Sequence, residues 1–127
     1  MALEDAGVGL KDMAFISAHG SATPRGDRSE LRSILDVAEA EKADVPVCGM
    51  KPYTGHMGAA SDLAEIILGV CALHHKMIPA TLHFQRAEKE FSAANVSSRH
   101  RPCDKRAFLS LSYGMGGQSS SIVITSR

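Results

Sequence analysis

The sequence predicts one α/β domain, and three observations lead to this fold class. Short apolar segments have the length and composition of buried strands, longer segments have apolar residues at helical spacing, and the two types alternate along the chain. At 127 residues, of which 44% are hydrophobic and 22% charged, the chain can bury a modest core. We therefore expect residues 1–127 to form a single domain.

The first third of the chain predicts a helix end, a strand and a second helix. The segment ALEDAG is typical of a helix that ends at Gly7, and MAFISA, residues 13–18, of a short buried strand. The segment DRSELRSILDVAEAE places Glu30 three residues after Asp27 and then continues with apolar residues at helical spacing. We predict a helix that has Asp27 as its N-cap.

The rest of the chain predicts a strand, a long helix and a hairpin. VPVCGM, residues 45–50, is typical of a buried strand, and the loop KPYTGH follows it. MGAASDLAEIILGVCALHH predicts a helix of about five turns that is apolar nearly all round, so we expect burial on most sides, with Cys71 inert inside. After an irregular stretch over residues 85–105, RAFLSLSYGMGGQSSSIVITSR predicts two strands joined across GMGG.

Charge and cysteine usage exclude several classes of partner and compartment. The 14 basic and 14 acidic residues balance, so we expect neither nucleic acid nor an anionic membrane as a partner. Cys48, Cys71 and Cys103 have neither zinc-site spacing nor the density of a secreted scaffold. No leader-like segment or apolar run of about 18 residues occurs, and we expect a cytoplasmic location.

Two histidines occupy equivalent places in this pattern. His19 ends one predicted strand, and His56 follows the next strand, five residues after Lys51. Ligands of open α/β sheets bind at the carboxyl ends of strands, so the two imidazoles are candidates for one pocket. The alternative is that both are loop residues that satisfy backbone groups. The other histidines receive no chemical role: His74, His75, His83 and His100.

Four segments follow one another along the chain: AHGSATPRGDRSE, KPYTGHMGAA, IPATLHF and LSYGMGGQSSSIVI. In this order and spacing they resemble the C-terminal half of a β-ketoacyl-[acyl carrier protein] synthase, a condensing enzyme of the thiolase-like superfamily. The resemblance runs from ALEDAG to SIVI, which is almost the whole chain. The resemblance implies half of a thiolase-like fold: a mixed sheet with helices, within an αβαβα arrangement of layers. It also implies that the nucleophilic cysteine lies in an N-terminal half outside these 127 residues.

The resemblance assigns roles residue by residue. His19, His56 and Lys51 match the catalytic residues. Asp27 and Glu30 match acidic residues that help to fix the loop, and Glu65 matches the glutamate that pairs with the lysine. Residues that match the pantetheine-binding and gating positions are Ser21, Thr23, Met115, Gly116 and Gly117. No metal site is implied. Three residues differ from the common residues of the family: Gln118, Ser119 and Ser21. The Gly-Ala-Ala sequence after His56 also begins one residue earlier than in the common family pattern.

The activity implied by the resemblance is decarboxylative Claisen condensation of malonyl-acyl carrier protein with an acyl thioester, in fatty acid or polyketide synthesis. Two neutral imidazoles would donate hydrogen bonds to the oxyanion, and the N-terminus of the helix after His56 would disfavour imidazolium there. The implied partners are an acyl carrier protein, which carries the phosphopantetheine, the N-terminal half and a second copy in a homodimer. We expect no resident cofactor, and no condensation by this chain alone.

Two alternatives stay open at the level of sequence. A non-catalytic ketosynthase-like partner subunit of the chain-length-factor type would shape a tunnel without performing chemistry. A metal module built from the six histidines is the other alternative, although only His74 and His75 are close in sequence and would point in different directions on a helix.

Overall fold

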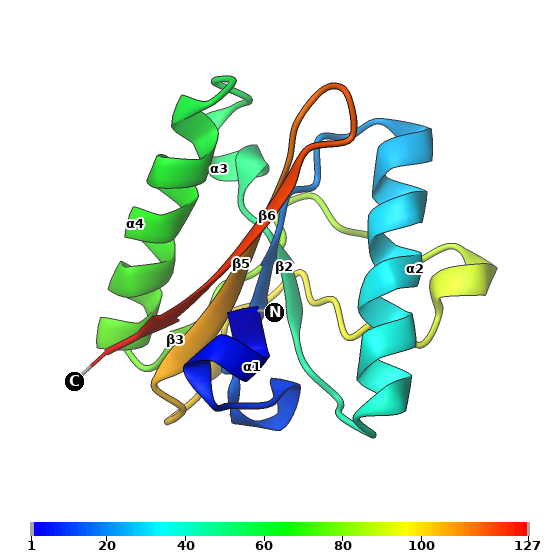
Figure 1. The fold of residues 1–127 in the computed structure, drawn as a ribbon. Coiled ribbons are helices and arrows are strands. Elements are labelled where there is room, and N and C mark those ends of the chain that lie inside the picture. Colours follow the sequence, from blue (N-terminus) through cyan, green and yellow to red (C-terminus); the bar gives the residue numbers. More distant parts are fainter. Residues whose placement is uncertain (1, 127) are drawn as a thin grey trace.

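The computed structural model describes residues 2–126 as three layers, with a mixed sheet in the middle. Helix α4 (Ala60–His74) covers one face of the sheet, and α2 (Pro24–Ala40) covers the other together with the short α1 (Ala2–Ala6), as Figure 1 shows. The predicted α/β class is confirmed, and so is the helix that ends at Gly7, whose φ is 66°.

The four-stranded sheet has the order β2-β1-β5-β6. One of its two inner strands, β1 (Ile16–Ala18), runs parallel to β2 (Val47–Gly49) and to the other inner strand, β5 (Ala107–Tyr113). The last strand, β6 (Ser119–Thr125), pairs antiparallel with β5 over seven residues, which confirms the predicted hairpin. Gly116 and Gly117 form its turn with φ values of 85° and 83°, a conformation that other residues adopt at a cost.

Small elements connect these layers. They are η1 (Leu10–Asp12), α3 (Lys51–Thr54), η2 (Lys89–Phe91) and the antiparallel pair β3 (Met77–Ile78) and β4 (Arg101–Pro102). The stretch predicted to be irregular over residues 85–105 therefore contains one helical turn and one short strand. Strands of two residues are too short to show a period in the sequence.

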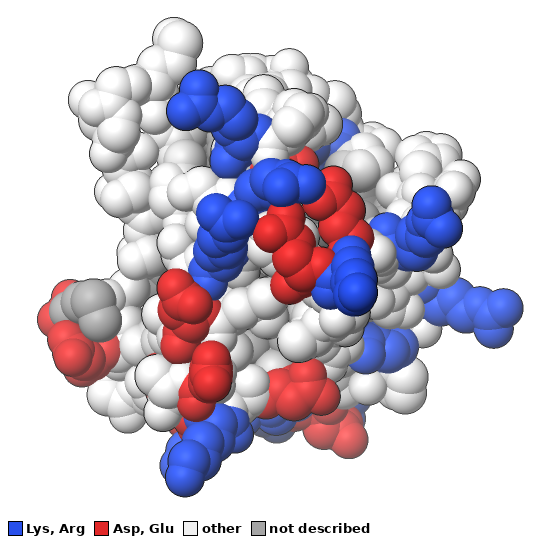
Figure 2. Space-filling view, turned by 90° about the vertical axis from the view of Figure 1, so that its right-hand side faces the viewer, with Lys and Arg blue, Asp and Glu red and all other residues white. Residues whose placement is uncertain are grey.

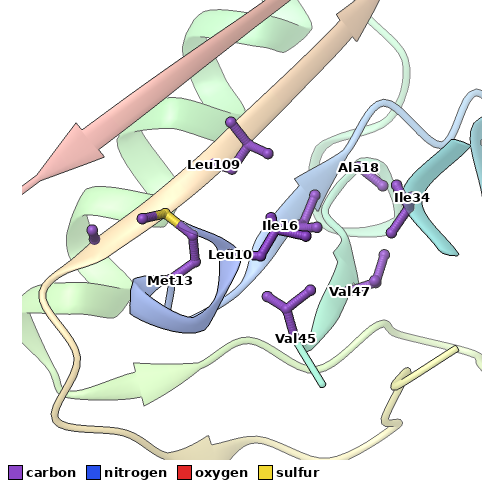
Figure 3. Packing of buried hydrophobic residues seen from close by; sticks show 9 residues of the cluster. Leu10, Met13, Ile16, Ala18, Ile34, Val45, Val47 and Leu109 are labelled. Atoms are coloured by element: carbon purple, nitrogen blue, oxygen red, sulfur yellow. The ribbon is translucent and has the colours of Figure 1, made fainter. Parts of the chain in front are cut away.

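Two apolar clusters fill the spaces on either side of the sheet. The cluster toward α2 contains Ile16, Ile34 and Leu109 together with Leu10 and Met13, and Figure 3 shows how these side chains meet. On the α4 side, Phe15 and Phe108 stack with ring centroids 4.9 Å apart and are fully buried. Ile16 and Leu109 thus face the α2 side, and their chain neighbours Phe15 and Phe108 face α4.

Helix α2 begins three residues before the predicted N-cap. Thr23 is the N-cap and Pro24 occupies the first helical turn, where its fixed φ suits the helix and its missing N–H costs nothing. Asp27 lies inside the first turn, and its backbone N–H donates to the carbonyl of Thr23. The prediction of Asp27 as N-cap is therefore wrong.

Helix α4 buries one side only within these residues. Ser61, Glu65, Gly69, Ala72 and Leu73 are buried. The opposite side exposes three large apolar residues, with Leu63 at 63%, Ile67 at 55% and Val70 at 44%. The expectation of burial on most sides is wrong for this chain, and so is the placement of Cys71, which is exposed.

The outer surface beside α2 carries charges of both signs, as Figure 2 shows. Arg28 contacts Glu88 and also lies 2.7 Å from Glu90, and Arg32 lies 3.1 Å from Glu90. These ion pairs connect the loop around η2 to α2. Among residues 2–126, no helix is both long enough and apolar enough to cross a membrane.

Candidate active site

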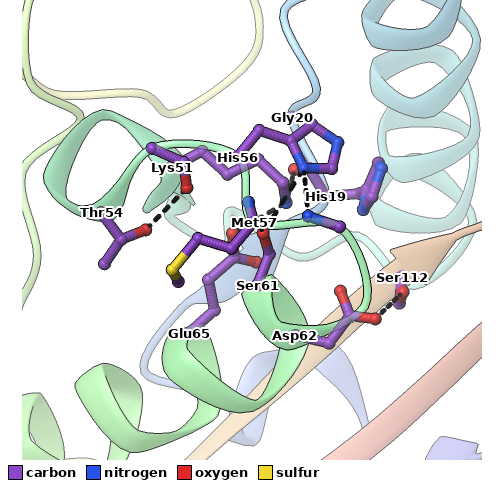
Figure 4. Close-up of polar contacts among 12 residues, drawn as sticks. His19, Gly20, Lys51, Thr54, His56, Met57, Ser61, Asp62, Glu65 and Ser112 are labelled. Carbon is purple, nitrogen blue, oxygen red and sulfur yellow. Dashed lines mark hydrogen bonds and ion pairs between the residues drawn. The ribbon is translucent and has the colours of Figure 1, made fainter.

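The two sequence-predicted histidines line one cavity of about 830 Å³ at the carboxyl end of β1. His19 directly follows β1, and His56 lies in the loop between α3 and α4 (Figure 4). Their ring centroids are 5.9 Å apart with the ring planes at 86°. The convergence of the two imidazoles inferred from the topology is thus present in the structure. The ring centroid of Tyr113, at the end of β5, lies 6.0 Å from that of His19.

Lys51 connects three elements beneath this cavity. Its Nζ lies 2.7 Å from Oε1 of Glu65 on α4 and donates also to the backbone carbonyl of His19. Both side chains are buried, so the ion pair is largely shielded from water. Burial raises the pKa of Glu65, and the hydrogen bond from Lys51 opposes this effect. The structure therefore brings together the lysine and glutamate that the resemblance pairs.

Glu30 holds the backbone on which His19 stands. Its two carboxyl oxygens accept hydrogen bonds from the N–H groups of His19, at 2.7 Å, and Gly20, at 2.9 Å. The side chain is buried, and this burial raises its pKa, while the two N–H donors lower it. Glu30 acts on the cavity through the loop and does not present a free carboxylate to a ligand.

Local hydrogen bonds orient His56 and select its tautomer. The backbone N–H of Gly58 donates to Nδ1 of His56 at 3.2 Å, so Nδ1 is the acceptor and the ring proton is on Nε2. The hydroxyl of Ser61 is 3.5 Å from the same nitrogen and also accepts from the N–H of Met57 at 2.8 Å. The Nε2–H of His56 is therefore a donor available to a ligand.

Burial and neighbouring charges both act on the pKa of His19. Partial burial lowers its pKa, and the nearby Lys51 ammonium lowers it further, while Asp62 and Asp27 raise it. Its Nδ1 is buried and has no hydrogen-bond partner among residues 2–126. At neutral pH the ring is thus predominantly uncharged.

The remaining predicted residues lie in different relations to the cavity. Ser21 and Thr23 line it, with their hydroxyls 3.0 Å apart, and so does Met115, which is 99% exposed. Gly116 and Gly117 form the adjacent turn and are not among the lining residues. Asp27 is half-buried, and its Oδ1 has no hydrogen-bond partner in the described part of the chain.

Asp62, Ser61 and Ser112 are parts of the site that the sequence did not single out. Asp62 lies in the first turn of α4 and lines the cavity, and its Oδ2 accepts a hydrogen bond of 2.6 Å from the hydroxyl of Ser112 on β5. An acidic residue in the first turn of a helix is ordinarily explained by the helix dipole. Asp62 and Ser112 are 50 positions apart in the sequence, so no local pattern could predict their contact.

The cavity has hydrogen-bond donors but contains no thiol. None of the cysteines lines it. Cys48 is buried, and burial raises its pKa to about 12, which makes it unreactive at neutral pH. Among residues 2–126, no group of three or more His, Cys, Asp or Glu residues is arranged to hold a metal ion. This arrangement suits stabilisation of a developing oxyanion by imidazole N–H donors.

Comparisons with known proteins give consistent similarities. Residues 1–85 match the family "Beta-ketoacyl synthase, C-terminal domain". The chain is 31% identical over 124 residues to 3-oxoacyl-[acyl-carrier-protein] synthase 2 of Vibrio cholerae, which covers 96% of this chain and 30% of that protein. It is 33% identical over 135 residues to erythronolide synthase EryA3 of Saccharopolyspora erythraea, and this match covers 97% of this chain and 4% of that protein.

Solved structures show the same likeness. The ishigamide ketosynthase/chain length factor superposes with a TM-score of 0.88 at 27% identity, covering 98% of this chain and 30% of that one. The AntDE:AntF complex, a type II PKS acyl-carrier protein with its ketosynthase, gives a TM-score of 0.89 at 27% identity, with 100% and 31% covered. This chain thus spans about 30% of the length of the Vibrio cholerae protein and of these solved chains, and a far smaller part of EryA3.

Proposed function

The chain belongs to the family of β-ketoacyl synthase C-terminal domains, and from this premise we propose that it supplies the two-histidine half of a condensing active site. The observation that carries the proposal is the convergence of His19 and His56 on one cavity, above the buried Lys51–Glu65 pair. The reaction is decarboxylative condensation of malonyl-acyl carrier protein with an acyl thioester.

The chemistry uses this chain's residues as donors and positioning groups. Decarboxylation breaks the bond between the malonyl carboxylate and its α-carbon, releases carbon dioxide and places negative charge on the thioester oxygen. The Nε2–H of His56 donates to this oxygen, because Nδ1 is occupied by the N–H of Gly58. His19 is a second donor, and Lys51 holds its backbone carbonyl.

Carbon–carbon bond formation needs a nucleophilic thiol that these residues do not bring to the cavity. The α-carbon of the carbanion attacks an acyl group held as a cysteine thioester, a new carbon–carbon bond forms and the thiolate leaves. We assign this cysteine to an N-terminal half of the synthase, since none of Cys48, Cys71 and Cys103 lines the cavity. The exposed side of α4, with Leu63 and Ile67, is the surface that this half would cover.

The remaining partners follow from the same proposal. An acyl carrier protein presents its phosphopantetheine to the cavity, where the hydroxyls of Ser21 and Thr23 are available to the arm. Met115, which lines the cavity and is 99% exposed, is in a position to gate the arm's access. The chain needs no resident cofactor, and the assembled synthase is a homodimer in the cytoplasm.

The test begins with the polypeptide that the native gene produces. We expect an intact mass several times 13.5 kDa and elongation of acyl carrier substrates by that polypeptide. His19→Ala and His56→Ala should abolish elongation, whereas His83→Ala should retain it, because His83 is exposed and does not line the cavity. Elongation that survives both cavity substitutions would overturn the proposal.

A non-catalytic partner subunit is the second candidate, because the similar solved structures include ketosynthase/chain-length-factor assemblies. The same assay separates the two functions. If the wild-type polypeptide elongates nothing alone but supports elongation by a separate ketosynthase, and His19→Ala and His56→Ala leave that support unchanged, the partner function holds.

A further inference from the structure

Asp62 brings a carboxylate into the cavity that the proposed condensation does not use. It lies on α4 six residues after His56, and its Oδ2 accepts the 2.6 Å hydrogen bond from Ser112. Ser112 is the residue before Tyr113, whose ring faces His19. The side chain of Asp62 is thus held at a fixed place on the wall that both imidazoles share, as Figure 4 shows.

The charges that face His19 come from three helices and a loop. Lys51 of α3 is cationic, and Asp62 of α4 and Asp27 of α2 are anionic. The nearby His56 ring disfavours a second positive charge. Two further carboxylates are already engaged: that of Glu65 pairs with Lys51, and that of Glu30 accepts backbone N–H groups. Asp62 raises the pKa of His19 more than Asp27 does.

The two imidazoles differ in the surroundings of their Nδ1 atoms. Nδ1 of His56 accepts a hydrogen bond from the N–H of Gly58. His19 has no hydrogen bond at Nδ1 within residues 2–126, so a proton there displaces no donor. Of the charged groups that face His19, the carboxylates of Asp62 and Asp27 favour a proton on its ring.

We propose that Asp62 is a positioning residue that supplies the counter-charge for a protonated His19, and that Ser112 holds its carboxylate in place for this purpose. An ordered carboxylate beside an imidazole stabilises the imidazolium and leaves the ring oriented. The relevance of this role to condensation rests on the proposed function. The electrostatic role itself is a property of this chain and can be measured without any substrate.

The experiment follows the titration of the His19 ring by NMR in the polypeptide that the native gene produces, with the resonance assigned from His19→Gln. Asp62→Asn removes the charge and keeps the shape, and Asp62→Ser is a second neutral variant in case the first is unstable. Ser112→Ala removes only the hydrogen bond. Asp36→Asn is the matched control, because Asp36 is an exposed carboxylate of α2 that does not line the cavity.

The expected result is a His19 midpoint at lower pH in both neutral variants than in the wild type. Ser112→Ala should shift the midpoint in the same direction by less, since the carboxylate remains but is no longer held. Asp36→Asn should leave it unchanged. An unchanged or higher midpoint in folded Asp62→Asn would overturn the proposal, and a wild-type midpoint in Ser112→Ala would overturn the role given to Ser112.

This readout also separates the present proposal from the proposed function. A lower midpoint combined with no elongation by the native polypeptide would leave the counter-charge role intact and remove the condensing one. Elongation by the native polypeptide without any shift of the His19 midpoint would leave the condensing role intact and remove the counter-charge role.

Discussion

The Nζ of Lys51 lies 2.7 Å from Oε1 of Glu65, and the two side chains are only 7% and 1% exposed. The same Nζ donates to the carbonyl of His19, so one ammonium group joins α3, the end of β1 and α4. An ion pair of this kind orients the cavity, and its stability depends on both members being present. Removal of either one leaves a buried charge without a partner.

Lys51→Met is expected to lower the free energy of unfolding by about 3–5 kcal/mol near neutral pH, the usual cost of breaking a buried ion pair. The loss should be smaller in mild acid, because Glu65 then takes up a proton, and burial already raises its pKa. Urea unfolding at two pH values measures both effects. The control is Lys76→Met. Nζ of Lys76 lies 3.4 Å from Oδ1 of Asp104, and the two side chains are 74% and 90% exposed. This substitution should therefore change the free energy of unfolding little. Equal losses at both positions would contradict the account.

Glu30 predicts a pH dependence of stability. Burial raises its pKa above the ordinary value of 4.5, so the folded state holds the proton more tightly than the unfolded state. The stability from this group is complete below pH 4.5 and is lost as the pH rises through the raised pKa. We therefore expect the stability of the wild type relative to Glu30→Gln to fall as the pH increases. Urea unfolding of both proteins at a series of pH values from about 4 to about 7 measures this difference. A relative stability that increases with pH would mean that the N–H bonds from His19 and Gly20 outweigh burial.

Gly69 permits close contact between α4 and the sheet. A Cβ at this position would lie 2.6 Å from Cε2 of Phe108, a fully buried ring. Gly69→Ala gains about 1 kcal/mol of helix propensity, and overpacking a core costs about 1–3 kcal/mol or more. Because Phe108 is stacked on Phe15 and has little room to move, we expect a net loss of stability in thermal or urea unfolding.

The matched control for this substitution is Gly114→Ala. Its Cβ would meet Gln118 at 3.5 Å, an ordinary contact at an exposed turn. We expect a change in stability well below that of Gly69→Ala. If Gly69→Ala is as stable as the wild type, the contact between α4 and Phe108 is looser than the structure indicates.

The exposed side of α4 predicts self-association of the isolated chain. Leu63→Gln, Ile67→Gln and Val70→Gln together should reduce both dimer or aggregate content in sedimentation and the binding of an apolar dye. Stability should change little, because exposed substitutions usually stay within about 0.5 kcal/mol each. Val37→Gln on α2, at 42% exposure, is the control and should leave association unchanged. A wild-type chain that is monomeric and binds no dye would contradict the prediction.

Local patterns in the sequence were enough to predict most of the elements. The helix that ends at Gly7, the strands β1 and β2 and the hairpin with Gly116 and Gly117 all follow from short-range chemistry: helix termination, apolar runs and turn residues. The start of α2 was missed because Pro24 at the first turn outweighed the capping pattern at Asp27.

The burial of α4 could not be predicted from its composition. An apolar sequence all round a helix indicates that most sides prefer to leave water, but it does not say which neighbours are present. Among residues 2–126 the side of α4 that faces away from the sheet is not covered, so Cys71 and Leu63 are exposed.

By itself the sequence determined the α/β class, the family resemblance and the candidates His19, Lys51 and His56, because these depend on residue types at short spacing. Only the tertiary structure decided the hydrogen-bonded tautomer of His56, the burial of the Lys51–Glu65 pair and the contact between Asp62 and Ser112. The physical reason is that a hydrogen bond or an ion pair depends on distances of a few ångströms in space. Residues separated by 50 positions in the chain come within that range only when the layers of the fold have packed.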